Sequence, residues 1–236
     1  MSIPRVELGT LVTCTGFRNP ALTAKIAETV DTISGGRLIL GLGSGDVEFE
    51  HREYGFPFDH PVSRFEEALH IITSLLRDGY CDFQGTYHQV HEAVLEPRGP
   101  RPHGPPILIG TLATGKRMLR LAAQHADLWN GWLGHGRSWP DVLLPLRETI
   151  DAACVRVGRD PATLQRTVVV RVALLGETVI GGVEPLAGTT CEIADAFREY
   201  ARGGVSHIQV WLVPNDLRGV EAFAAVLEEL DRGEPA

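Results

Sequence analysis

The chain has 236 residues, a length that fits one large domain better than two. Apolar residues make up 44% and charged residues 22%, which is ordinary for a globular protein and excludes a disordered or fibrous chain. The net charge is −8 without a basic cluster, so a nucleic-acid partner is not expected. No apolar run reaches the roughly eighteen residues that a membrane helix needs, so no membrane association is expected either.

The cysteines and the first residues bear on the cellular compartment. Cys14, Cys81, Cys154 and Cys191 are too far apart for a zinc site and too few for a disulfide scaffold. The start of the chain carries charged residues within its only apolar stretch, unlike a secretory signal. We therefore expect a cytoplasmic protein with reduced cysteines and no bound metal.

The first elements alternate between strand and helix. Residues 6–12 fit a strand, and Asn19 followed by Pro20 is typical of a helix start. Apolar residues at helical spacing then form one stripe, which ends at the glycine pair 35–36: Leu22, Ile26, Val30 and Ile33. The unbroken apolar run 38–40 predicts a strand buried on both faces, ending in the glycine-rich segment 41–45.

A charged and aromatic loop precedes the next helix, whose start has two candidate caps. Ser63 and Glu66 form a capping box, while Asp59 could cap an earlier start before Pro61. After this helix we expect an excursion at about 79–106, with a short hairpin of 81–83 and 86–90 about Gly85.

The rest of the chain continues the alternation. We expect strands at 107–110, 128–130, 168–175 and 207–213. A helix follows each strand: around 118–122, at 139–157 with Ser138 as its cap, from a capping box of Thr189 and Glu192 to the glycine pair 203–204, and at 220–230.

Six strand and helix pairs in strict alternation predict an α/β fold with parallel strands, either as a barrel or as a doubly wound open sheet. The last strand favours the barrel. Alternate residues of a barrel strand face the lumen, so His207, Gln209 and Trp211 would point inward while Ile208, Val210 and Leu212 meet helices. An open sheet covered on both faces would not accommodate three polar or amphipathic side chains in one row.

The glycine-rich segment carries the first chemical signal. Gly41, Gly43 and Gly45 follow a strand as in a dinucleotide-binding motif, but Asp46 stands where that motif needs glycine and would repel pyrophosphate. Two interpretations stay open. The glycines permit a tight exit from the strand, or they let a flat cofactor ring lie against the backbone at the C-terminal end of a barrel strand.

Residues 110–116 carry the second signal, because they connect a strand to a helix. Such a loop offers backbone amides, and this one adds two hydroxyls and one ammonium that suit a phosphate. A plain turn with Thr114 as the helix cap is the alternative.

Several short motifs occur in a characteristic order: Leu8-Gly9-Thr10-Leu11-Val12, Phe17-Arg18-Asn19-Pro20-Ala21, Asp31 with Ser34-Gly35-Gly36-Arg37, Leu40-Gly41-Leu42-Gly43-Ser44-Gly45, Arg64-Phe65-Glu66-Glu67, Phe83-Gln84-Gly85-Thr86-Tyr87, Pro105-Pro106-Ile107-Leu108-Ile109-Gly110, and Ala126-Asp127-Leu128-Trp129-Asn130. In this order and spacing the sequence resembles the bacterial luciferase-like oxidoreductases over nearly its whole length. The resemblance implies a (β/α)8 barrel of the TIM type and a cofactor that is either FMN or the deazaflavin coenzyme F420.

The resemblance also implies roles for particular residues. Ring and ribityl contacts would come from Leu11, Val12, Gly43, Ser44 and Gly45, with a non-proline cis peptide at Leu11-Val12 beneath the ring. The phosphate would bind at Gly110, Thr111, Leu112, Ala113, Thr114, Gly115 and Lys116. Candidates on the substrate side are Asp46, His207, Gln209 and Trp211, and the catalytic residues stay unassigned.

The sequence departs from the family at its front. Family members begin with two further strand and helix units, so we expect a single domain over 1–236 that holds about six of eight units. The strands at 6–12 and 207–213 would then have open edges, which predicts a poorly soluble or oligomeric chain. A start codon placed too far downstream is the preferred explanation, and a degenerate homologue or a chain completed by a partner are the alternatives.

The function implied by the resemblance is oxidoreduction of a small organic substrate. Reduced FMN or coenzyme F420 would serve monooxygenation or hydride transfer, while the protein orients the reactants and excludes water. The rival hypothesis is an inactive, truncated homologue that acts as a binding module. Besides the substrate, the expected partners are further copies of the chain in a homo-oligomer, with a flavin reductase as another candidate.

Overall fold

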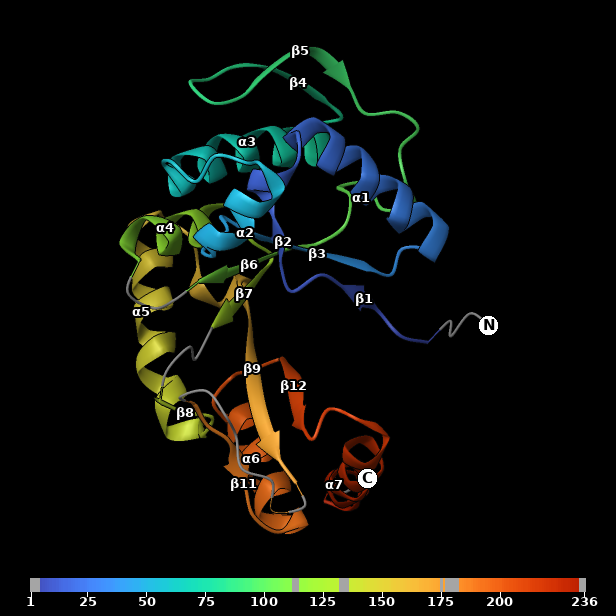
Figure 1. The fold of residues 1–236 in the computed structure, drawn as a ribbon, viewed down its shortest axis with the longest axis vertical. Helices are drawn as coiled ribbons and strands as arrows, with labels where there is room; N and C mark the ends of the chain where they lie inside the picture. Colours follow the sequence, from blue (N-terminus) through green and yellow to red (C-terminus); the bar gives the residue numbers. More distant parts are fainter. Residues whose placement is uncertain (1–4, 112–114, 132–135, 175, 177–182, 234–236) are drawn as a thin grey trace. The chain divides into compact units, whose positions relative to one another are not determined.

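The computed structural model describes residues 5–111, 115–131, 136–174, 176 and 183–233. The chain divides into two compact units (Figure 1). The first unit comprises Met1–Gly110 and Arg120–Leu128, and the second comprises Thr111–Leu119 and Trp129–Ala236. Helix α4 (Lys116–His125) runs from the second unit into the first.

Parallel strands form the centre of the first unit. Within the strand predicted at 6–12 only β1 (Leu8–Gly9) is a strand, and a second short piece, β2 (Thr13–Cys14), follows the predicted end; both pair with β3 (Leu38–Gly43). Strand β3 in turn pairs with β6 (Ile107–Thr111), so that Leu40 lies opposite Ile107. Every residue of β3 is buried, as the unbroken apolar run predicts for a strand covered on both faces.

Helix α1 (Pro20–Ser34) begins and ends where the sequence predicts. The Asn19 side chain accepts hydrogen bonds from the first backbone amides, and Gly35 ends the helix with a φ of 72°. The apolar stripe, however, faces outward: Leu22 is 54% and Ile33 82% exposed. The opposite face is buried instead, and it includes Ala24, Ala27 and Asp31, whose carboxylate pairs with the Arg101 guanidinium.

The segment between β3 and the next long helix differs from the prediction in two ways. A short helix, α2 (Glu48–Tyr54), occupies the expected loop. Helix α3 (Pro61–Asp78) begins directly at Pro61, after His60 with a φ of 51° and no side-chain cap. The predicted capping box of Ser63 and Glu66 is therefore wrong, since Ser63 is the third residue of the helix and not its N-cap. Asp59 instead binds the guanidinium of Arg64.

The expected hairpin is present as the antiparallel strands β4 (Tyr80–Gln84) and β5 (Gln89–Val94), although the second strand begins three residues later than predicted. It is attached to α3 by one carboxylate, because Glu67 accepts hydrogen bonds from the backbone amides of Thr86, Tyr87 and His88 at 2.8–2.9 Å. These bonds lower the pKa of Glu67, although partial desolvation acts in the opposite direction.

Two long parallel strands organise the second unit. Strand β9 (Gln165–Ala173) pairs with β12 (His207–Val213) along its length, and with the short β11 (Leu186–Ala187) on its other side. The remaining strands are β7 (Leu128–Gly131), β8 (Gly136–Arg137) and β10 (Val183–Glu184), the last two paired with each other. The helices are α5 (Leu143–Arg156), α6 (Thr190–Arg202) and α7 (Leu217–Arg232).

The two helix starts predicted in this unit have different outcomes. The capping box of Thr189 and Glu192 is present, with each residue binding the backbone of the other. Ser138 is not a cap. It is buried, its hydroxyl accepts a hydrogen bond from the backbone amide of Arg171, and α5 begins only at Leu143.

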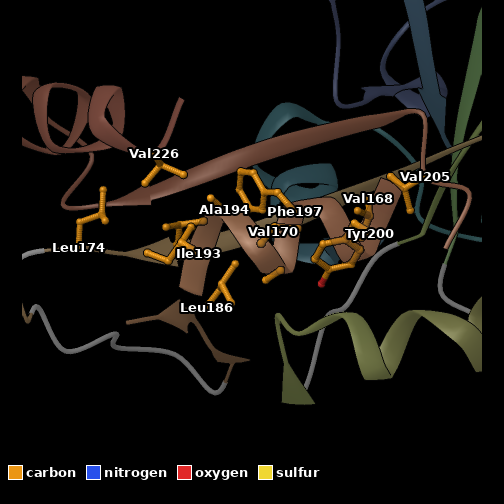
Figure 2. Packing of buried hydrophobic residues seen from close by; sticks show 12 residues of the cluster. Val168, Val170, Leu174, Leu186, Ile193, Ala194, Phe197, Tyr200, Val205 and Val226 are labelled. Carbon is orange, nitrogen blue, oxygen red and sulfur yellow. The ribbon is translucent and has the colours of Figure 1, made fainter. Parts of the chain in front are cut away.

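The core of the second unit lies between β9 and α6 (Figure 2). Val168, Val170 and Val172 of β9 pack on the helix together with Leu174, which follows the strand. Ile208, Val210 and Leu212 of β12 pack against the same cluster. Because side chains alternate along a strand, His207, Gln209 and Trp211 occupy the opposite face, as the barrel interpretation predicts. Six strand and helix pairs thus follow one another in chain order, counting β1 and β2 as one strand.

None of the helices among the described residues has both the length and the apolar composition needed to cross a membrane.

Candidate functional site

The end of strand β3 and the residues after it, Gly41 to Gly45 (here called the glycine exit), are shaped by the neighbouring first strand. From Gly9 to Thr13 the first strand advances four residues, while its partner residues on β3 advance three, from Ile39 to Leu42. Within this irregularity the Leu11–Val12 peptide is cis, as expected. The Thr10 hydroxyl replaces the regular backbone pairing, because it accepts a hydrogen bond from the Gly41 amide and donates one to the Gly41 carbonyl.

Close packing explains two glycines of this exit. A Cβ on Gly41 would stand 1.8 Å from the Thr10 carbonyl oxygen, and one on Gly43 would stand 2.7 Å from Val12 Cγ2. Only glycine allows the two strands to approach this closely. The tight-exit interpretation of these glycines therefore has a direct steric reason, and the cofactor interpretation stays a prediction.

The predicted ring-binding residues lie together in the first unit. Leu11 and Val12, between β1 and β2, are 50% and 40% exposed. Val12 contacts the glycine exit at Gly43, while Ser44 and Gly45 are half-buried and Asp46 is exposed. Leu11 and Val12 thus present an apolar surface next to a loop that lacks bulky side chains.

A cysteine and a histidine support the same loop, and sequence reasoning did not single them out. Cys14 Sγ lies 3.6 Å from His51 Nε2, and His51 Nδ1 lies 2.9 Å from the Pro57 carbonyl oxygen. His51 is buried against Phe17, with 4.6 Å between the ring centroids. Nδ1–H donates to this carbonyl, so in the neutral ring Nε2 can accept a hydrogen bond from the thiol.

These two side chains occupy the space beside Gly45. A Cβ on Gly45 would stand 2.5 Å from Cys14 Sγ and 2.7 Å from His51 Nε2. Burial raises the pKa of the Cys14 thiol, which favours the thiol over the thiolate in this contact. The sequence holds little signal for it, because the contact joins residues 37 positions apart.

The predicted phosphate loop is described only at its ends. Gly110 is half-buried, and Thr111 is buried with its hydroxyl accepting a hydrogen bond from Trp129 Nε1 at 2.9 Å. Leu112, Ala113 and Thr114 lie outside the described residues. Gly115 and Lys116 are exposed, and α4 begins at Lys116. Its role in phosphate binding stays a prediction.

The substrate-side candidates on β12 have separate environments. Gln209 Oε1 accepts a hydrogen bond from Asn130 Nδ2 at 2.9 Å, and the same amide group donates to the buried Thr167 hydroxyl at 2.8 Å. Gln209 is thus engaged in a polar network between strands. His207 is exposed, and Trp211 is 46% exposed beside Arg171.

Comparison with curated proteins yields relatives that are named as reductases. The phthiodiolone/phenolphthiodiolone dimycocerosates ketoreductase of Mycobacterium sp. (strain JLS) is 35% identical over 162 residues, which cover 68% of this chain and 41% of that protein. The 5,10-methylenetetrahydromethanopterin reductase of Archaeoglobus fulgidus is 37% identical over 155 residues, with coverages of 65% and 43%. The chain therefore spans roughly two fifths of the length of these relatives.

Solved structures share the fold over almost the entire chain. An F420-dependent secondary alcohol dehydrogenase in complex with an F420-acetone adduct has a TM-score of 0.77 at 17% identity, covering 95% of this chain and 79% of that one. The coenzyme F420-dependent tetrahydromethanopterin reductase of Methanopyrus kandleri has a TM-score of 0.76 at 19% identity, with coverages of 96% and 82%. The expected α/β fold of the TIM-barrel type, incomplete relative to eight units, is thereby confirmed.

The family comparison covers the first unit and much of the second. Residues 4–179 match the family described as luciferase-like monooxygenase, and they include the glycine exit of β3 and the loop before α4. This chain belongs to the luciferase-like monooxygenase family.

Proposed function

We propose that this chain is a coenzyme-binding part of an oxidoreductase that transfers hydride between coenzyme F420 and a small organic substrate. Both curated relatives described above are named as reductases, and the two solved structures are F420-dependent enzymes. A monooxygenase that uses FMN is the second candidate, favoured by the family's description and by the likeness to a monooxygenase from Streptomyces bottropensis.

The observation that carries the proposal is the uncovered apolar surface of Leu11 and Val12. It lies next to Gly43, where Val12 Cγ2 already occupies the space that a side chain would need, so a planar ring would pack on the Val12 side chain. Flat cofactor rings are mostly apolar and bind against such surfaces, with backbone groups to fix their orientation. The residues present therefore fit the ring of a flavin or deazaflavin.

The chain's own residues would bind and orient the cofactor. Leu11 and Val12 would cover one side of the ring and exclude water from it, while Lys116 and the amides at the start of α4 would attract the phosphate. Asp46, exposed beside the loop, would lie toward the substrate. When bound, coenzyme F420 supplies the hydride chemistry, and FMN would support oxygen chemistry.

The test is a titration of the chain with F420 and with FMN, followed by absorbance and fluorescence. Leu11→Asp should weaken binding of the preferred cofactor at least tenfold, because a charge would replace apolar contact with the ring. Leu22→Asp is the matched control, since Leu22 is a similarly exposed leucine of the same unit on the outer face of α1. It should leave the affinity unchanged.

Three results would count against the proposal. If the chain binds neither cofactor, the inactive binding module is the better hypothesis. If both aspartate variants bind as tightly as the parent chain, the ring does not lie on Leu11. If FMN binds and F420 does not, the monooxygenase candidate replaces hydride transfer from F420.

A further inference from the structure

One arginine of the second unit has a buried donor without a partner. Arg171 lies on β9 and its Nη1 is buried with no hydrogen-bond partner among the described residues. Arg98 and Arg166 also have a buried Nε without a hydrogen-bond partner. Their guanidinium groups, however, form ion pairs with the carboxylates of Glu28 and Asp151. The Arg171 guanidinium has no such ion pair in the described part of the chain.

The neighbour of Arg171 is an aromatic ring. Register pairs Arg171 with Trp211 across β9 and β12, and the guanidinium carbon lies 4.7 Å from the centroid of the Trp211 ring. The Trp211 ring thus lies against the guanidinium, and this contact restricts how the guanidinium can turn. Trp211 keeps 46% of its surface exposed, so part of the Trp211 side chain is accessible.

The pair occupies a functional position of the fold. It lies two residues before the C-terminal ends of β9 and β12, at Ala173 and Val213, and on the strand face opposite the core packed by α6. Ligands of α/β barrels bind at the carboxyl ends of the strands. A buried cationic donor without a partner costs stability unless it is satisfied by water or by a ligand.

We propose that Arg171, stacked on Trp211, binds a carboxylate of the substrate. The planar guanidinium can donate two parallel hydrogen bonds to a carboxylate, and the Trp211 ring offers apolar contact to the carbon skeleton next to it. The substrate is then a small organic acid whose reacting carbon lies elsewhere in the molecule. This inference rests on the proposed function, which it deepens by naming the substrate class.

The experiment measures carboxylate binding without any cofactor. Sodium acetate, benzoate and phenylpyruvate are titrated into the full chain by isothermal calorimetry, with benzyl alcohol as the neutral comparison. At least one carboxylate should bind, and Arg171→Gln should weaken it about tenfold or more, which is the effect of losing charge-assisted hydrogen bonds. Arg171→Lys should be intermediate, because it keeps the charge and loses the fork.

Two controls separate this role from a structural one. Arg202→Gln removes an exposed arginine at the end of α6 and should leave carboxylate binding unchanged. If Arg171→Gln fails to fold, tryptophan fluorescence still decides: the bound acid should change the emission of the parent chain, and Trp211→Phe should abolish that change.

The outcomes that overturn the inference are distinct from those of the cofactor titration. No binding by any of the three acids, or equal binding by the parent chain and Arg171→Gln, means that water satisfies Arg171. Displacement of the acid by inorganic phosphate with equal affinity means that the site takes a phosphate group instead. Loss of F420 and FMN binding would refute the proposed function alone, because the acid titration contains no cofactor.

Discussion

Alanine variants of Gly45 and Gly55 measure how much the packing beside the glycine exit contributes to stability. Both have a φ of 76° and both lie in the first unit. A Cβ on Gly55 would meet nothing within 4 Å, whereas one on Gly45 would meet Cys14 Sγ and His51 Nε2 at 2.5 and 2.7 Å. Replacing each with alanine therefore places an alanine at the same positive φ, and only Gly45→Ala adds a steric clash.

The expected magnitudes follow from these two effects. Alanine in the left-handed region costs about 1 kcal/mol relative to glycine, so Gly55→Ala should lower the free energy of unfolding by about that amount. Overpacking adds about 1–3 kcal/mol, which brings Gly45→Ala to about 2–4 kcal/mol. His51 has little freedom to move away, because it is buried and its Nδ1 is bonded to the Pro57 carbonyl.

Urea unfolding followed by circular dichroism gives the difference between the two variants. A third chain with Cys14→Ala and Gly45→Ala together should recover part of the lost stability, since the sulfur atom nearest the new methyl group is gone. Equal destabilisation by the two single alanine variants, with no recovery in the double variant, would show that the Cys14 and His51 side chains do not restrict residue 45.

The remaining predictions concern charge. Lys116→Glu should weaken FMN binding more than riboflavin binding, whereas the control Lys25→Glu on the exposed side of α1 should change neither; equal loss for both ligands in Lys116→Glu would remove the phosphate assignment. The three amide bonds that lower the pKa of Glu67 favour its ionised form in the folded chain, so their stabilisation is present above the usual glutamate pKa and is lost as the pH falls through the lowered value. Glu67→Gln should therefore speed hydrogen exchange of the Thr86 amide at pH 7. In the parent chain the protection of this amide should fall as Glu67 becomes protonated, whereas in Glu67→Gln it should not. The same pH profile of protection in both chains would contradict this role.

The features that could be predicted from the sequence are those that local interactions decide. Asn19 and Gly35 mark the ends of α1 because a side-chain cap and a left-handed glycine act within one turn of the helix. The alternation along β12 separates Gln209 and Trp211 from Val210 for the same local reason. The capping box of Ser63 and Glu66 failed because Pro61, two residues earlier, started the helix first.

The tertiary structure alone decided which surfaces and side chains meet. The apolar stripe of α1 predicts a buried face, yet Ala24 and Asp31 of the opposite face are the buried ones, because their neighbours come from distant segments such as Arg101. The Cys14 and His51 contact, and the stacking of Arg171 on Trp211, likewise join elements that are far apart in the chain. Periodicity and capping act over a few residues, so sequence patterns determine the elements and their order, whereas the contacts between elements depend on how the strands are paired.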